Sequence, residues 1–100
     1  MEAVAIIDQV TSSLIGVFPN CEKAAEEIAV ELEPMASHWT VTSIETQKDL
    51  PLIDVIRLEG YDSVESFLTT YFEDCRIQKT LGLWDRYDLG ITVWRYFINK

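Results

Sequence analysis

The chain of 100 residues contains few of the residue types from which catalytic and cofactor sites are commonly built. It has one histidine, two cysteines and four glycines. The glycines are scattered, so the sequence contains neither a GxGxxG nor a GxxxxGK[ST] phosphate-binding loop. It also contains no CxxC pair, no HExxH motif and no calcium loop of the D-x-[DN]-x-[DN]-G type. We therefore expect no cofactor and no bound metal.

Basic residues are also scarce, with 8 Lys and Arg against 17 Asp and Glu and a formal net charge of −9. This balance opposes direct binding to nucleic-acid phosphates and to anionic lipid head groups. No apolar run reaches the roughly eighteen residues of a membrane helix, and the start of the chain lacks the positive charge of a secretory signal. We expect a soluble cytoplasmic protein that contacts neither nucleic acid nor membrane, with Cys21 and Cys75 as reduced thiols.

No pattern of side chains identifies a reaction. The single histidine, His38, lies beside Trp39 at the start of a predicted strand, where a surface residue is the simpler interpretation. No pattern points to a cysteine–histidine pair with Cys21 or Cys75, although sequence does not exclude one. Seventeen carboxylates do not by themselves identify an acid–base pair. We therefore expect a protein that is not an enzyme.

The first half of the chain predicts two helices. The residues 3–17 show apolar side chains at alternating spacings of four and three, which is typical of one helix face. The β-rich run SLIGVF within this segment leaves a strand as the alternative. The second helix is expected over residues 21–33, with Asn20 as its N-cap and Pro34 at its end.

The second half predicts four strands and one further helix. HWTVTSIET and LIDVIRL are rich in β-branched and apolar residues and indicate an antiparallel pair that ends at Gly60. A helix over residues 61–75 follows, with Asp62 as N-cap and Glu65 three residues later. The residues 80–100 indicate a hairpin with its loop at Asp88-Leu89-Gly90, where Gly90 can take a positive φ angle.

The predicted element order is therefore ααββαββ. With 48% hydrophobic residues, the chain can bury a core without metal or disulfide. No linker or low-complexity tract divides the chain. We expect one compact α+β domain over residues 1–100, in which helices pack on one face of an antiparallel sheet of about four strands.

Acidic residues are distributed unevenly along the chain. Residues 1–33 carry seven acids and one base, while residues 76–100 carry five bases and two acids. On a helical wheel, the second helix has a buried stripe made by Ala25, Ile28, Ala29 and Leu32. Glu22, Glu26 and Glu33 lie along one border of this stripe, and Glu27 and Glu31 lie along the other. Like charges at a spacing of four destabilise a helix slightly, which weakly indicates that they serve a purpose.

The C-terminal run is rich in aromatic residues. If ITVWRYFI is a strand, Ile91, Val93, Arg95 and Phe97 share one face, and Thr92, Trp94, Tyr96 and Ile98 share the other. Both faces carry bulky side chains. Either the strand is central in the sheet or one of its faces contacts a second copy or a target, because Trp, Tyr and Arg commonly anchor interfaces.

Two functions are consistent with these features. The first is a small acidic binding protein that docks on a basic surface of a larger protein, such as a nucleic-acid-processing or defence complex, in the manner of phage-encoded inhibitors and immunity proteins. The second is a structural or adaptor domain that self-associates, for instance as a homodimer, or docks in an assembly through its aromatic strand. The candidate contact residues are Glu22, Glu26, Glu27, Glu31, Glu33, Asp62, Glu65, Glu73, Asp74, Trp84, Tyr87 and Trp94.

Overall fold

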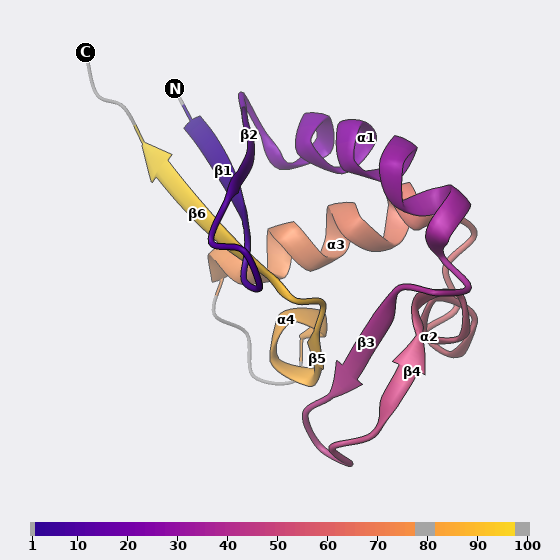
Figure 1. The fold of residues 1–100 in the computed structure, drawn as a ribbon. Coiled ribbons are helices and arrows are strands. Elements are labelled where there is room, and N and C mark those ends of the chain that lie inside the picture. Colours follow the sequence, from indigo (N-terminus) through magenta and orange to yellow (C-terminus); the bar gives the residue numbers. More distant parts are fainter. Residues whose placement is uncertain (1, 78–81, 98–100) are drawn as a thin grey trace.

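Strands and helices alternate irregularly along the chain of this α+β protein (Figure 1). The computed structural model describes residues 2–77 and 82–97. The strands are β1 (Glu2–Asp8), β2 (Leu14–Phe18), β3 (Thr40–Ser43), β4 (Asp49–Pro51), β5 (Tyr87–Asp88) and β6 (Ile91–Phe97). The helices are α1 (Cys21–Leu32), α2 (Leu52–Leu58), α3 (Val64–Ile77) and α4 (Leu83–Arg86), with a 3₁₀ turn, η1 (Glu33–Met35), after α1.

The described strands form two antiparallel sheets of three strands, ordered β2-β1-β6 and β4-β3-β5. The α+β class is thus confirmed, but the expectation of one sheet with about four strands is wrong. After α4 the chain passes directly from the β4-β3-β5 sheet into the β2-β1-β6 sheet. β5 pairs with β3, and after two intervening residues β6 begins its pairing with β1.

Residues 2–18 form the β1–β2 hairpin, so the helix predicted over residues 3–17 is wrong and the strand alternative for SLIGVF is correct. Val4 and Ile6 are fully buried at strand spacing. The turn is held by the Asp8 carboxylate, which accepts hydrogen bonds from the backbone N–H groups of Val10 (2.8 Å) and Thr11 (3.3 Å). Pairing of β1 with β6 along its whole length completes the sheet.

LIDVIRL is the helix α2, not the predicted strand. Its buried residues Leu52, Val55 and Ile56 have the i, i+3, i+4 spacing of a helix face. Gly60, with φ of 81°, ends this helix and does not close a hairpin. Its N–H donates to the carbonyl of Arg57, and the next N–H donates to Ile56, which is the hydrogen-bond pattern of a Schellman motif. The strand that pairs with β3 is β4, from the preceding QKDLP segment.

The two long helices were correctly predicted. The Asn20 side chain caps α1 by accepting a hydrogen bond from the N–H of Lys23 at 2.7 Å. At the start of α3 the cap is Ser63 and not Asp62. The Ser63 hydroxyl accepts from the N–H of Ser66, and the Ser66 hydroxyl accepts from the N–H of Ser63, as in a capping box.

The predicted C-terminal hairpin is also wrong, because β5 and β6 belong to different sheets. LWDR, which precedes β5, is the short helix α4. Gly90 nevertheless has the expected positive φ angle, 76°, and its N–H donates to the Asp88 carboxylate. This glycine lets the chain turn from one sheet into the other.

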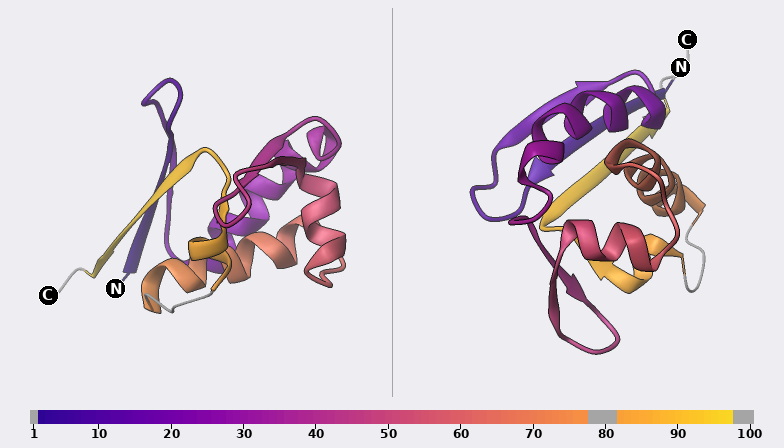
Figure 2. Two further views of the ribbon diagram at one scale, coloured as in Figure 1. Left: turned by 90° about the horizontal axis from the view of Figure 1, so that it is seen from below. Right: turned by 90° about the vertical axis from the view of Figure 1, so that its right-hand side faces the viewer.

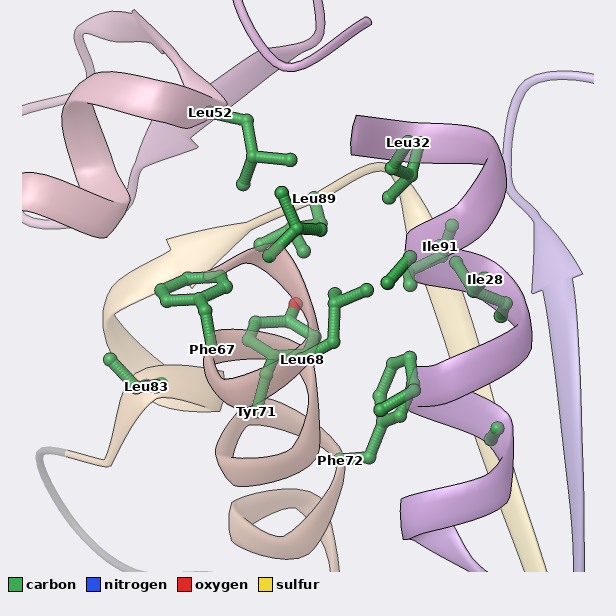
Figure 3. Close-up of a cluster of buried hydrophobic side chains, with 14 of the residues drawn as sticks. Ile28, Leu32, Leu52, Phe67, Leu68, Tyr71, Phe72, Leu83, Leu89 and Ile91 are labelled. Atoms are coloured by element: carbon green, nitrogen blue, oxygen red, sulfur yellow. The ribbon is translucent and has the colours of Figure 1, made fainter. Parts of the chain in front are cut away.

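The core lies between the β2-β1-β6 sheet and the helices α1 and α3, which pack against each other on the same side of that sheet (Figure 2). In Figure 3, Leu68 and Phe72 of α3 point toward α1, the helix that carries Ile28 and Leu32. The second sheet and α2 extend this core at the other end. No helix in the described ranges is long and apolar enough to cross a membrane. None of the described helices covers the other face of the β2-β1-β6 sheet, which we call the open face and where Leu14, Val17 and Trp94 are exposed.

Candidate protein-binding surfaces

The open face of the β2-β1-β6 sheet is mainly apolar, and none of its described side chains is charged. Directly paired residues point to the same face of a sheet, so the pairing places six side chains here in two rows, Val17-Ala5-Trp94 and Leu14-Ile7-Thr92. Val17 and Leu14 are each 60% exposed and Trp94 is 51% exposed. A patch of this kind on a protein with a net charge of −9 is typical of a protein contact.

The charged residues of the same strands point to the other face. Arg95 of β6 and Glu2 of β1 form an ion pair on the helix side of the sheet, with their side chains only 6% and 18% exposed. Buried Ile91 and Val93 lie on the same face as Arg95, as the strand pattern predicted. This arrangement confines charge to the inner face and leaves the open face without it.

A groove runs between the edge strand β2 and α1. One hollow of about 200 Å³ is lined by residues 15–18 of β2 and by Glu27, Ile28 and Glu31 of α1. A second hollow of about 180 Å³ adjoins it and shares Ile15, Ile28 and Glu31. It continues to Asp8 of β1, Leu32 of α1, Met35 and Trp39 of the chain after α1, and Ile91 of β6. We call the two hollows together the β2–α1 groove.

All charged residues that line this groove are acidic. They are Asp8, Glu27 and Glu31, and no lysine or arginine of residues 2–77 and 82–97 lines either hollow. The remaining lining is mainly apolar, and Ile15 and Met35 are 38% and 49% exposed. The groove therefore combines a negative potential with apolar contact area.

The wheel predicted for α1 is confirmed. The stripe residues Ala25, Ile28, Ala29 and Leu32 are buried, and the five glutamates beside it, Glu22, Glu26, Glu27, Glu31 and Glu33, are exposed. Lys23 lies between the two borders, with its ammonium group 3.3 Å from Glu26 and 3.4 Å from Glu27. The hydrogen bond to Glu26, followed by its charge, raises the pKa of Lys23. Only one border, with Glu27 and Glu31, lines the β2–α1 groove.

The acids predicted on α3 occupy different environments. Asp62 and Glu65 are exposed beside the start of the helix, and Glu73 is half-buried. Asp74, in contrast, is 7% exposed, and its carboxylate accepts a hydrogen bond from the N–H of Leu83 at 2.6 Å. Asp74 therefore holds α4 against α3 and does not belong to the acidic surface, contrary to the expectation.

Trp84 and Tyr87, two of the expected anchors, take part in internal contacts. The Trp84 ring packs on Tyr71 at a centroid distance of 5.2 Å. The Tyr87 hydroxyl donates to the Glu59 carboxylate at 2.7 Å, and Arg86 donates to both oxygens of the same carboxylate at 3.1 and 2.7 Å. Burial, together with the hydrogen bond to Glu59, raises the pKa of Tyr87 to about 12. Glu59 was not predicted, because nothing in its local sequence shows that α4 will lie against it.

The metal-binding residue types of the described chain do not gather at one site. The described side chains include no group of three or more His, Cys, Asp or Glu that could hold a metal ion. His38 is exposed, Cys21 is buried, and the side chain of Cys75 lies outside the described residues. Comparison with protein-family models, with curated proteins and with solved structures finds no match for this chain.

Proposed function

We propose that this protein is a small non-enzymatic binding protein that docks on a positively charged surface of a larger protein. The observation that carries the proposal is the acidic side of α1. Five exposed glutamates border a helix stripe that the core already uses, so they contribute nothing to core packing. Their mutual repulsion is offset only in part by Lys23.

Two of the arginines form internal ion pairs and therefore do not lie among the acids of α1. Arg86 is paired with Glu59, and Arg95 is paired with Glu2. Each pair neutralises itself locally, so these arginines do not offset the acids of α1. A field of one sign accelerates the encounter with an oppositely charged partner and discriminates against like-charged ones.

An inhibitory role follows naturally from such docking. Proteins that process nucleic acids hold their substrate with Lys and Arg side chains that contact phosphates. A protein that covers those side chains with carboxylates competes directly with the nucleic acid. We therefore propose an inhibitor of a nucleic-acid-processing or defence complex, which itself contacts no nucleic acid.

The test is affinity capture from the native source, with mass spectrometry of the retained proteins. The variant carries Glu26→Gln, Glu27→Gln and Glu31→Gln on α1, and a control carries Glu45→Gln, Asp54→Asn and Asp85→Asn, which neutralise three exposed acids elsewhere. We expect the wild type and the control to retain the same basic protein and the α1 variant to lose it.

Two results would contradict the proposal. One is a retained partner that is unaffected by neutralising α1. The other is an affinity that stays constant from about 50 mM to about 500 mM salt, because screening weakens contacts between exposed charges.

The open sheet face favours a second candidate function, which is self-association as a structural or adaptor domain. The three strands have seven, five and seven residues and make a face of roughly 14 by 23 Å. A twofold contact through this face alone is smaller than the roughly 1,200 Å² of total buried surface typical of specific interfaces, so a stable dimer must also include residues beyond the face. Trp94→Ala should then lower the molar mass measured by light scattering, while Val30→Ala, at an exposed apolar position of α1, should not. A wild-type protein that stays monomeric at all accessible concentrations would exclude this candidate.

A further inference from the structure

We infer that the β2–α1 groove binds an extended segment of the partner, which adds as a further strand to the free edge of β2. The inference rests on the proposed function in one respect, namely that the partner is basic. It adds the place of contact, the conformation of the bound segment and its residue pattern. Four observations on the groove lead to it.

The first observation is that β2 is an edge strand. In the described part of the chain it pairs with β1 alone, so one row of its backbone N–H and C=O groups faces away from the sheet. Extended peptides commonly bind such edges through main-chain hydrogen bonds. Gly16, at the middle of the strand, has no side chain. A Cβ atom added there would lie 2.7 Å from the Phe18 ring, so a larger residue would collide with the ring.

The second observation is the charge of the wall opposite this edge. Glu27 and Glu31 of α1 face the groove and are one helical turn apart, and Asp8 lies at its wider end. Among the described lining residues there is no base, and Lys23, the base on α1, is outside both hollows. An acidic or neutral segment gains nothing from these carboxylates, whereas lysine and arginine side chains do.

The third observation is the apolar floor below these carboxylates, formed mainly by Ile15, Phe18 and Ile28. Lysine and arginine bury their aliphatic stems on apolar surface while their charged ends remain at a polar rim. The groove offers both parts, with the floor for the stems and the glutamates for the charged ends. This combination matches long basic side chains better than short polar ones.

The fourth observation is the continuity of β2 with the open sheet face. Successive side chains of a strand added to β2 would alternate between the helix side, with Glu27 and Glu31, and the open side, beside Leu14 and Val17. Basic residues suit the first side and apolar residues suit the second. The bound segment is therefore expected to alternate lysine or arginine with apolar residues.

The test uses a labelled peptide of sequence Lys-Val-Lys-Val-Lys-Val-Lys, titrated into the full-length protein at low salt. We expect binding, with NMR shift changes concentrated at residues 14–18 and 27–31. Two variants carry the same change of charge on the same helix. Glu27→Lys with Glu31→Lys reverses the border that lines the groove, and Glu22→Lys with Glu26→Lys reverses the other border.

The groove variant should weaken peptide binding by about tenfold more than the matched variant does. Each variant removes one of the two glutamates that Lys23 contacts, so the loss of ion pairs is the same. All four positions are exposed, and thermal unfolding of both variants is compared to show that each remains folded. Equal weakening by the two variants would overturn the inference.

Two further peptides test the strand itself. A peptide of the same composition, Lys-Lys-Val-Val-Lys-Lys-Val, has the same charge without alternation and should bind less well. N-methylation of alternate amides along one edge of the original peptide removes the donors of that edge. One of the two N-methylated forms should lose binding and the other should retain it, because only one edge faces β2. Full binding by both forms would exclude strand addition.

These experiments separate the inference from the proposed function. If the captured partner is lost equally from both charge-reversed variants, the partner is attracted by the total charge of α1 and not by the groove. The proposed function then stands and the groove inference fails. If neither variant affects the partner, both fail. If the partner is lost from the groove variant alone, both are supported.

Discussion

The carboxylate of Asp74 is the buried link between the end of α3 and the start of α4. It accepts a hydrogen bond from the N–H of Leu83 at 2.6 Å. Loss of the carboxylate would leave this buried N–H group without its acceptor. We expect Asp74→Ala to lower the free energy of unfolding by about 1–3 kcal/mol. Urea denaturation measures the change, and Glu73→Ala, at the half-buried neighbour, serves as control with an expected change below about 0.5 kcal/mol. An equal decrease in the free energy of unfolding for the two variants would show that the hydrogen bond of Asp74 does not stabilise the fold.

Tyr87 makes the free energy of unfolding depend on pH in the alkaline range. Its pKa is raised from 10.0 to about 12 in the folded state. Below about pH 10 both states keep the proton, and the contribution of Tyr87 is complete. Between about pH 10 and about pH 12 the unfolded state loses the proton while the folded state keeps it, so stability falls as pH rises.

The corresponding experiment compares the wild type with Tyr87→Phe, which lacks the hydroxyl that donates to Glu59. We expect the wild type to be more stable by about 1 kcal/mol at neutral pH. This advantage should shrink as pH rises above about 10, as measured by urea denaturation at each pH. A difference that is constant over this range would contradict the assignment.

At the scale of elements, predictions succeeded where one local pattern determined the structure. α1 and α3 each carry a helical stripe, and α1 also has a good cap at Asn20. The β1–β2 hairpin was missed because Ala3, Ile7, Val10, Leu14 and Val17 match a helix spacing by coincidence, although Val10 and Leu14 are exposed. The pairing that decides for strands comes from β6, about ninety residues later in the chain.

The candidate site was only half predictable for the same reason. The acidic borders of α1 follow from the helical wheel, so Glu27 and Glu31 could be named from the sequence. The groove that they line exists only because β2 is a strand beside the helix. A sequence assigned as two helices has no sheet edge there, so a strand-binding site could not be inferred. Likewise, the burial of Asp74 depends on α4, which was predicted as part of a strand region.

The hairpin turn between β1 and β2 contains a residue in an unfavourable conformation. Ser12 has φ of 58°, in the left-handed region where glycine is favoured, whereas Ser13 is not among the described residues with a positive φ. We expect Ser12→Gly to be more stable than Ser13→Gly by about 1 kcal/mol, although glycine loosens the unfolded chain equally in both. Thermal unfolding of the two variants gives the comparison. The reverse order would mean that the turn is not formed as described.

For the whole molecule, charge has opposite consequences for folding and for binding. The chain carries 17 acids and 8 bases, and three of the bases that the structure describes, Lys23, Arg86 and Arg95, already pair with acids in the folded state. Compaction brings the excess acids together, so self-repulsion opposes folding. The same excess attracts the basic partner that we propose. Salt screens both interactions and therefore should act on them in opposite directions.

We accordingly expect the urea midpoint to rise between about 20 mM and about 300 mM sodium chloride, while the affinity for the lysine–valine peptide falls over the same range. Glu22→Lys with Glu26→Lys should reduce the rise of the midpoint, because it removes repulsion without touching the groove. A midpoint that falls with salt would show that ion pairs such as Arg95 with Glu2 outweigh the repulsion between the excess acids. Repulsion between the excess acids would then destabilise the fold very little. It would no longer be evidence that the acidic surface serves binding.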